Sequence, residues 1–404
     1  MISKRNIICF ASGWDYHPTS KHHIMRRLSE HNNVIWVNWH ASRRPRLGFA
    51  DACAIVSKLR QIQHGPKEVC GAITTLTPLQ LPMPSSALAR RMNAVFAKRS
   101  IARVLARFPD WPVQIWSFAP DVGEVVTQFD PELVLYYCVD AFGEFPGYDA
   151  ALIDRLERQL MSVSDIVVTT SPPLYDAKRQ LHPNVHAIQH GVDHAHLSRA
   201  VHHEFPMPEE LKRLKKPIFG FVGVIGDWVD LDIIAGLAKA RPDVSIAMIG
   251  PELRSRGACG GLKNVYWLGG KDHTMLPAYL QHFDVGLIPF KHQALTYNAN
   301  PIKLYEYLAA GVPTVSTSLP AVEAMAGHVW VADDPVNMAT ACDEALRCND
   351  AEARAARSVL MTAESWSARL EQLSELISTT CGPRATRTST VQHSQSLTPA
   401  VQAG

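Results

Sequence analysis

The chain has 404 residues, which is more than one compact core normally needs, so two domains are expected. Its 47% hydrophobic and 19% charged residues exclude a disordered or fibrous protein. No apolar run approaches the roughly eighteen residues of a membrane span, and the start MISKRNIICF lacks a signal-peptide core. The eight cysteines show no CxxC pairing and are expected to be reduced thiols of a cytoplasmic protein.

The net charge of +2 hides a strong asymmetry. Residues 1–107 contain 17 lysines and arginines against four aspartates and glutamates, so the remainder carries an excess of acid. Basic and apolar residues alternate in ARRMNAVFAKRSIARVLARF (residues 89–108). Such a surface suits an anionic membrane, anionic substrates or nucleic acid, and a merely solvated basic face explains it equally well. No recognised nucleic-acid module is present, so nucleic acid is not expected as a partner.

The first half alternates strand and helix patterns. Residues 41–90 are less regular and include the proline-rich stretch LTPLQLPMPSS. Helices are predicted at Lys21–Glu30, in a basic segment ending near Arg107, from Asp121, and at Ala150–Met161. The predicted strands are Asn6–Ser12, Val34–Trp39, Val113–Ser117, Leu133–Val139, Asp165–Ser171 and His186–Val192.

Residues 195–216 interrupt this alternation and are predicted to be a linker between domains 1–194 and 217–382. The second half then repeats the pattern, with the option that the last helix packs back on the first domain. Residues 383–404 are rich in Ser, Thr and Gln and are predicted to be a disordered tail. In the second half, the predicted strands are 217–226, 245–251, 265–269 and 284–290, and the predicted helices begin at Asp230, Val336 and Ala363.

Alternating strands and helices predict parallel sheets covered by helices, an α/β fold of two Rossmann-like domains. In open sheets of this kind, ligands bind beyond the carboxyl ends of the strands. Two such domains joined by a linker would therefore face each other across a cleft that holds the ligand.

The stretch NPIKLYEYLAAGVPTVST (residues 300–317) predicts a helix whose start suits an anion. Asn300 is a capping residue and Pro301 suits the first helical position. The free N–H groups of that turn, together with Lys303, form a positive site, and Glu306 projects from the same face. The alternative is an ordinary helix with a solvated Lys303–Glu306 salt link.

A second phosphate-binding candidate is FGFVGVIGD, in which Gly223 and Gly226 follow a strand. Glycines there allow backbone N–H groups to approach a phosphate, although a simple tight turn also requires them. Neither a GxGxxG fingerprint nor a P-loop is present. Taken with residues 300–306, the pattern suits a nucleoside diphosphate, with Glu306 accepting hydrogen bonds from ribose hydroxyls.

The segments FGFVGVIGDWVDLDII, VYWLGG, DVGLIPF and NPIKLYEYLAAGVPTVST resemble the donor domain of bacterial GT-B glycosyltransferases. YYCVDAFGEFPGYD, DIVVTTSPPL and HGVD resemble the matching N-terminal half. The chain is most similar to enzymes that build exopolysaccharide or teichuronic-type polymers, including the xanthan glucuronosyltransferase type.

The resemblance implies roles for particular residues. The lysine of the donor stretch, Lys303, would contact the diphosphate, and the residue three later, Glu306, would contact the ribose. Retaining members carry a glutamate eight residues before that position, and this chain has Asn298 instead. An aspartate placed like Asp140 acts as the catalytic base in the xanthan-type enzyme, and catalysis in this family uses no metal.

Asp140 also stands out from its position, because it ends the strand LVLYYCV. It is a candidate general base for an acceptor hydroxyl, or a cap of the following turn, and the two roles are compatible. Asp230 and Asp232 are interpreted as partners of a helix start rather than metal ligands. Further candidate donor or acceptor contacts are His190, Trp14, Asp15 and His17; no metal-ligand spacing is present.

The resulting hypothesis is a glycosyltransferase, a hexosyl- or glycuronosyltransferase, that uses a nucleotide-sugar, most plausibly UDP-linked. The acceptor would be a glycan or lipid-linked intermediate of surface or exopolysaccharide biosynthesis. The basic first domain would rest on the anionic inner face of the cell membrane. The alternatives are a sugar-nucleotide epimerase of the same architecture and a non-catalytic nucleotide-sugar-binding relative.

Overall fold

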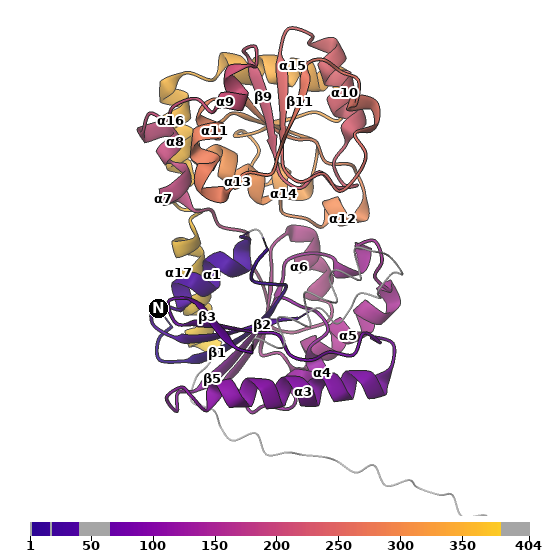
Figure 1. Ribbon diagram of the computed structural model, residues 1–404, viewed down its shortest axis with the longest axis vertical. Helices are drawn as coiled ribbons and strands as arrows, with labels where there is room; N and C mark the ends of the chain where they lie inside the picture. Colours follow the sequence, from indigo (N-terminus) through magenta and orange to yellow (C-terminus); the bar gives the residue numbers. More distant parts are fainter. Residues whose placement is uncertain (1, 17, 40–64, 381–404) are drawn as a thin grey trace, which may run out of the picture.

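The computed structural model describes residues 2–16, 18–39 and 65–380. Two α/β domains lie one above the other, each built around its own sheet (Figure 1). The predicted fold class, an α/β protein with two Rossmann-like domains, is therefore confirmed. The predicted tail 383–404 lies outside the described residues.

The first sheet has eight strands in the order β3-β4-β2-β1-β5-β6-β7-β8. All neighbours pair in parallel except β3, which pairs antiparallel with β4. Buried side chains cover both of its faces, which is why its central strands are continuous apolar runs. The strands are β1 Asn6–Ala11, β2 Asn33–Asn38, β3 Lys67–Cys70, β4 Ile73–Leu76, β5 Val113–Ser117, β6 Leu133–Cys138, β7 Ile166–Thr169 and β8 Val185–Ala187.

The helices of the first domain begin at residues suited to a helix start. Ser86, Asp149 and Ser171 each accept a hydrogen bond from a first-turn N–H at the start of α3, α5 and α6. These helices are α1 Ser20–Leu28, α3 Ala87–Leu105, α4 Gly123–Val126, α5 Ala150–Val163 and α6 Pro172–Lys178, with a short 3-10 turn at Phe142–Glu144.

The second sheet has six parallel strands in the order β11-β10-β9-β12-β13-β14. They are β9 Ile218–Val222, β10 Ser245–Ile249, β11 Val265–Gly269, β12 Val285–Ile288, β13 Thr314–Ser316 and β14 Trp330–Val331. Its helices are α10 Leu231–Ala240, α11 Leu276–Gln281, α12 Ala294–Tyr297, α13 Ile302–Ala309, α14 Pro320–Glu323, α15 Pro335–Arg347 and α16 Ala351–Leu360, with 3-10 turns at Gly257–Cys259 and His273–Met275.

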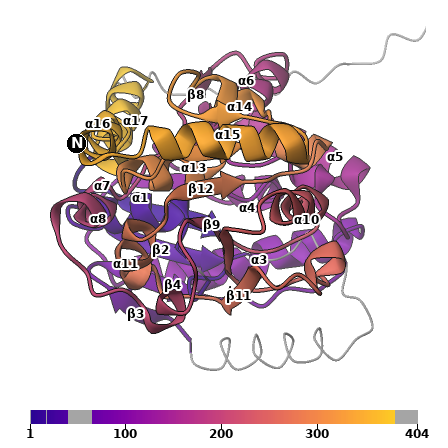
Figure 2. The same cartoon turned by 90° about the horizontal axis from the view of Figure 1, so that it is seen from above.

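The chain crosses between the domains twice. Residues 195–216 form no extended linker: the short helices α7 His194–Leu197, α8 Arg199–His202 and α9 Glu209–Lys212 bury Leu197 and Leu211 in the core of the second domain. The last helix, α17 Trp366–Thr380, returns to the first domain. Its apolar stripe, which includes Trp366, Leu370 and Leu373, packs against the first sheet, and it lies beside α1 in both views (Figures 1 and 2).

Several elements were not predicted from the sequence. The β3–β4 hairpin falls in the segment 41–90, where no periodic pattern stood out. Strand β14 has two residues and helix α16 is exposed on most of its surface, so neither carries a clear apolar pattern. These elements lie at sheet edges or on the surface and do not alter the arrangement of the strand ends.

Candidate functional site

Helix α13 meets the first domain where its first residue, Ile302, packs against that domain's core. Asn300, just before α13, donates from Nδ2 to the Thr170 oxygen (2.8 Å), and the Thr170 hydroxyl donates to the Val139 oxygen (3.1 Å). Val139 directly precedes Asp140, at the carboxyl end of β6. The predicted diphosphate-binding turn and the predicted base therefore belong to one region, where the carboxyl ends of the first sheet's strands face the second domain.

Lys303 and Glu306 form an ion pair on α13. Lys303 Nζ lies 2.5 Å from Glu306 Oε2, and the two side chains are only 13% and 7% exposed. The alternative of a solvated salt link is therefore wrong: the pair is held largely out of water, where a pair of charges interacts more strongly. In this pair the glutamate accepts one of the three protons that the ammonium group can donate.

The charge of Glu306, in the second domain, also acts on His23 of α1 in the first domain. Burial is the main reason that the pKa of His23 falls to about 3; His273, Arg27 and Arg26 lower it further, whereas Glu306 opposes the shift. The His23 ring stacks on Trp366 with centroids 5.6 Å apart and planes 7° apart, and lies 5.8 Å from the His273 ring. A neutral His23 is thus part of the packing that joins the domains beside the Lys303–Glu306 pair.

Asn300 does not cap α13, contrary to the prediction. Pro301 occupies the N-cap position and no side-chain cap is made. Asn300 Nδ2 instead donates to the backbone oxygen of Thr170 in the first domain (2.8 Å) and lies 3.2 Å from the Tyr305 hydroxyl. The Asn300 side chain binds the other domain, and Pro301 makes no side-chain cap. The N–H groups at the start of α13 are therefore not covered by a cap.

The glycines after β9 form the predicted turn for reasons of packing. A Cβ on Gly226 would lie 2.4 Å from the Trp228 ring, and one on Gly250 would lie 1.7 Å from the Gly223 oxygen. Helix α10 is capped by Asp230, whose carboxylate accepts from the N–H groups of Asp232 and Ile233. A carboxylate already occupies that helix start, which agrees with the interpretation of Asp230 and Asp232 and leaves α13 as the better place for a phosphate.

Asp140 is partly buried, and burial raises the pKa of its carboxyl to about 6, while the Lys21 ammonium group opposes the shift. The 3-10 turn that follows begins after Ala141 without a side-chain cap, so the predicted capping role is not seen. Among the described residues, no side chain or N–H donates a hydrogen bond to this carboxylate. A carboxylate with this pKa and free lone pairs can accept a proton from a hydroxyl near neutral pH.

The remaining predicted contacts differ in character. His190 is buried, with Nδ1 lacking a partner among the described residues, and burial with the nearby Arg369 lowers its pKa to about 4. Trp14 is fixed by two hydrogen bonds: its N–H donates to Asn38 Oδ1, and its carbonyl oxygen accepts from His22 Nε2. Asp15 is exposed beside it, and His17 lies outside the described residues.

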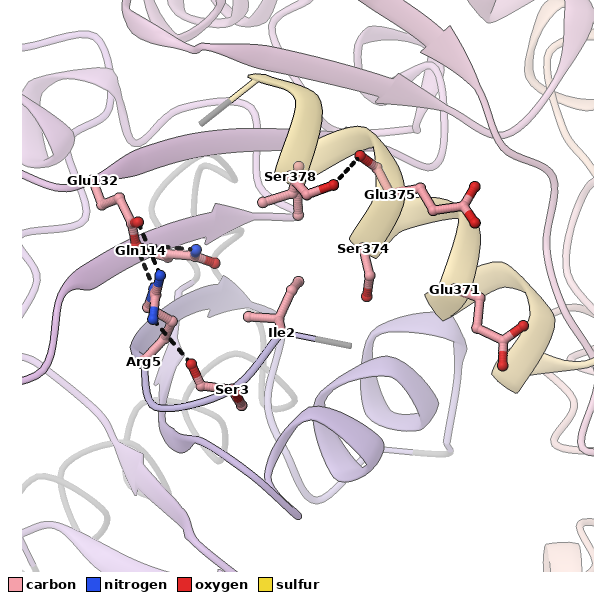
Figure 3. Close-up of a pocket in the computed structure, with 10 residues that line it drawn as sticks. Ile2, Ser3, Arg5, Gln114, Glu132, Glu371, Ser374, Glu375 and Ser378 are labelled. Carbon is pink, nitrogen blue, oxygen red and sulfur yellow. Dashed lines mark hydrogen bonds and ion pairs between the residues drawn. The ribbon is translucent and has the colours of Figure 1, made fainter. Parts of the chain in front are cut away.

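One cavity lies away from this junction (Figure 3). It measures about 560 Å³ and lies between α17 and the amino ends of β1, β5 and β6, beside the Arg5–Glu132 ion pair. A second cavity, of about 390 Å³, lies at the carboxyl ends of β12 and β13. Its polar lining, His292, Gln293 and Ser318, can exchange hydrogen bonds with hydroxyl groups.

Sequence reasoning missed several residues of the junction. Lys21 is predicted only as the start of a helix, yet its partly buried ammonium group interacts with Asp140. Ser171 was read as a strand end, yet its hydroxyl donates to the Asn298 oxygen of the other domain (2.6 Å). Trp366 and Arg369 come from the far end of the chain and are placed here only by the return of α17.

A metal centre does not emerge from the described residues, which contain no cluster of three or more His, Cys, Asp or Glu side chains placed to hold an ion. The six described cysteines are free thiols. The junction contains a candidate anion site on α13, the Asp140 carboxylate just after β6, and the imidazoles of His23 and His190, whose pKa values are lowered mainly by burial.

Residues 216–348 match the family model described as "Glycosyl transferases group 1". TuaH of Bacillus subtilis (strain 168), a glycosyltransferase named for teichuronic acid biosynthesis, is 23% identical over 280 residues, which span 64% of this chain and 70% of TuaH.

Solved structures are similar over nearly the whole chain. Sucrose-phosphate synthase from Thermosynechococcus elongatus superposes with a TM-score of 0.66 at 14% identity, covering 93% of this chain and 98% of that one. HepE from Anabaena, in complex with UDP-glucose, gives 0.64 at 14% identity, covering 93% and 99%. At 14% identity, the structural similarity shows the fold alone. The chain therefore has the GT-B fold, and its second domain and its relative make it similar to group 1 glycosyltransferases.

Proposed function

We propose that this enzyme transfers a hexosyl or glycuronosyl group from a UDP-sugar to a glycan or lipid-linked acceptor in surface or exopolysaccharide biosynthesis. The reaction would take place in the cytoplasm, at the inner face of the cell membrane. The observation that carries the proposal is the chain of hydrogen bonds from Asn300, just before α13, through Thr170 to Val139, which precedes Asp140.

On the donor side, Lys303 and the uncapped start of α13 would bind the diphosphate. Both are positive, and both gain most when the bond from the sugar to the diphosphate breaks and negative charge builds up on the leaving oxygen. Glu306 is pinned by Lys303 and would accept from the ribose hydroxyls with its second oxygen. That HepE was crystallised with UDP-glucose supports a UDP-linked donor in the same fold.

On the acceptor side, Asp140 would take the proton of the attacking hydroxyl. The acceptor oxygen then bonds to the anomeric carbon as the bond to the diphosphate breaks, and UDP leaves with the electron pair. Asn298 stands where retaining relatives carry a glutamate, and its backbone is engaged with Ser171. A single direct displacement by a base-activated hydroxyl inverts the configuration at the anomeric carbon, and we expect that outcome.

The relative TuaH supports an acceptor in cell-surface polymer synthesis. The cavity lined by His292, Gln293 and Ser318 adjoins the segment leading to Asn300 and is our candidate for the sugar of the donor.

The test is to measure UDP release from purified protein with UDP-glucose, UDP-galactose and UDP-glucuronate, with and without a bacterial membrane extract as acceptor source. We expect release with one donor that requires the extract and is matched by sugar incorporated into it. An altered UDP-sugar formed without extract would indicate an epimerase instead. Binding of UDP without any turnover over the whole donor set would indicate a non-catalytic relative.

A further inference from the structure

A ridge of apolar side chains is exposed on the first domain. Five of the thirteen large hydrophobic side chains exposed among the described residues lie between residues 79 and 95. The apolar ridge consists of Leu79, Met83, Leu88, Met92 and Val95. The last three are spaced by four and three residues, so they share the outer face of α3. Such clustering of apolar surface indicates contact with something other than water.

The ridge stands on a fixed backbone. Arg90 is held by Glu124 (Nε to Oε1, 2.9 Å) and donates through Nη1 to the Pro84 oxygen (2.9 Å). Asn93 makes hydrogen bonds in both directions with the backbone of Leu81, at 2.7 and 3.1 Å. The loop that carries Leu79 and Met83 is therefore clamped onto α3 from the inside, and its apolar side chains point outward from an ordered surface.

Positive charge continues where the ridge ends. The exposed cations of α3 and its C-terminal end are Arg91, Lys98, Arg99, Arg103 and Arg107. Residues 77–107 contain no aspartate or glutamate, and none of the five cations forms an ion pair with a described residue. Among the described residues, Arg90 is the one arginine of α3 with an ion-pair partner, and its side chain is only 18% exposed. The exposed side of α3 thus carries apolar side chains in its first half, with Arg91 among them, and cations in its second half.

The ridge begins next to the candidate acceptor side of the site. Its loop leaves β4 at the carboxyl edge of the first sheet, where Asn38 Nδ2 donates to Thr77 Oγ1 (2.9 Å). The Oδ1 of the same Asn38 accepts from the Trp14 N–H (3.0 Å). Figure 1 shows α3 along the side of the first domain turned away from the second domain, which therefore leaves its outer face uncovered.

We propose that the apolar ridge and the five cations are the surface with which this protein rests on an anionic lipid bilayer. The purpose of this contact rests on the proposed function, because a lipid-linked acceptor stays in the membrane, but the contact itself does not require the reaction. No described helix is both long and apolar enough to cross a bilayer, so attachment would be interfacial. The apolar half would enter the headgroup region while the cations meet anionic lipid headgroups.

The test uses full-length protein and sedimentation with vesicles of two parts phosphatidylcholine to one part phosphatidylglycerol. We expect salt-sensitive binding to these vesicles and much weaker binding to pure phosphatidylcholine. Lys98→Ala/Arg99→Ala/Arg103→Ala should lower the affinity on the order of a hundredfold, because each cation near an anionic surface contributes roughly fivefold. Leu88→Gln/Met92→Gln should lower it by roughly tenfold and leave the salt dependence in place.

Matched controls come from the second domain. Arg213→Ala/Lys215→Ala/Lys239→Ala removes three exposed cations, and Val336→Gln/Val359→Gln removes two exposed apolar side chains. Both should bind vesicles like the unaltered protein. UDP binding by thermal shift, which needs no membrane, should be the same in all variants.

Two outcomes would overturn the assignment. Vesicle binding that is absent, or that the α3 variants do not change, would remove this surface from membrane contact. A dimer in sedimentation velocity that Leu88→Gln/Met92→Gln dissociates would show that a second copy of the chain covers the ridge. Failure of UDP binding or turnover with intact vesicle binding would instead contradict the proposed function and leave the surface standing.

Discussion

Asn300 ties the start of helix α13 to the first domain by donating from Nδ2 to the backbone oxygen of Thr170, over 2.8 Å. Beside it, the Ser171 hydroxyl donates to the Asn298 oxygen over 2.6 Å. These two hydrogen bonds therefore fix the position of the helix that carries Lys303 and Glu306 relative to the strand ends of the opposite domain. A site composed of parts from two domains needs such a link, because a misplacement of about 1 Å is costly for catalysis.

We expect Asn300→Ala to lower the free energy of unfolding by about 1–3 kcal/mol, because the buried Thr170 oxygen loses its donor. Urea denaturation measures this change. Asn298→Ala is the matched control: it loses only a hydrogen bond to the Ala294 oxygen on its own helix and keeps the backbone contact to Ser171. Equal effects of the two substitutions would argue against a stabilising hydrogen bond between Asn300 and the Thr170 oxygen.

Lys303→Ala should weaken UDP binding by roughly ten- to a hundredfold, the usual worth of a charge-assisted hydrogen bond to phosphate. The substitution also leaves Glu306 buried and unpaired, which lowers stability. The double variant Lys303→Met/Glu306→Gln removes that penalty and should fold like the unaltered protein while still binding UDP poorly. Calorimetric titration with UDP reports the affinity; a double variant that binds UDP normally would remove α13 from the donor site.

Asp140→Asn should reduce the rate of transfer by about 10²–10⁴-fold while UDP binding stays unchanged. It should also raise stability at pH 7. The pKa of Asp140 is raised from 3.8 to about 6, so its ionised form opposes folding above that pH and the cost disappears below pH 3.8. Allowing for partial exposure, the gain is about 1–2 kcal/mol. Full activity of Asp140→Asn would rule out its role as the base.

The acid side of the pH–rate profile should reflect the same carboxyl group. Because the base must be ionised, kcat/KM should fall as pH decreases through about 6. The Lys21 ammonium group favours the ionised form, so Lys21→Met should move this fall to higher pH. Lys239→Met, at an exposed position in the second domain, is the control and should leave the profile where it was. An unmoved profile in Lys21→Met would mean that another group sets it.

Acidification should weaken the domain junction. His23 has its pKa lowered to about 3, so the folded protein keeps it neutral, and stability is lost as pH falls from 6.5 towards 3. Between pH 6.5 and 5 the loss amounts to about 2 kcal/mol from this residue. His23→Phe preserves a ring against Trp366 and should be less sensitive to acid in urea denaturation at the two pH values. His328→Phe, at an exposed position, should retain the full sensitivity.

The sequence by itself determined the local features of this protein. Apolar strands such as Leu133–Val139, separated by amphipathic helices, specify parallel sheets because only a strand buried on both faces is apolar throughout. The stretch from Asn300 to Gly311 specified a helix with Lys303 and Glu306 on one face, because residues three apart must project together. The position of Asp140 after a strand placed it at the ligand-binding edge.

Only the tertiary structure decided which of these features meet. Asn300 has the chemistry of a helix cap, but the other domain offers it a buried carbonyl at Thr170, and that partner prevails. Lys21 reaches Asp140, and Trp366 reaches His23, across more than a hundred residues of sequence. Such contacts depend on how elements far apart in the sequence pack together, within a domain or between the two, a long-range property that no local periodicity records.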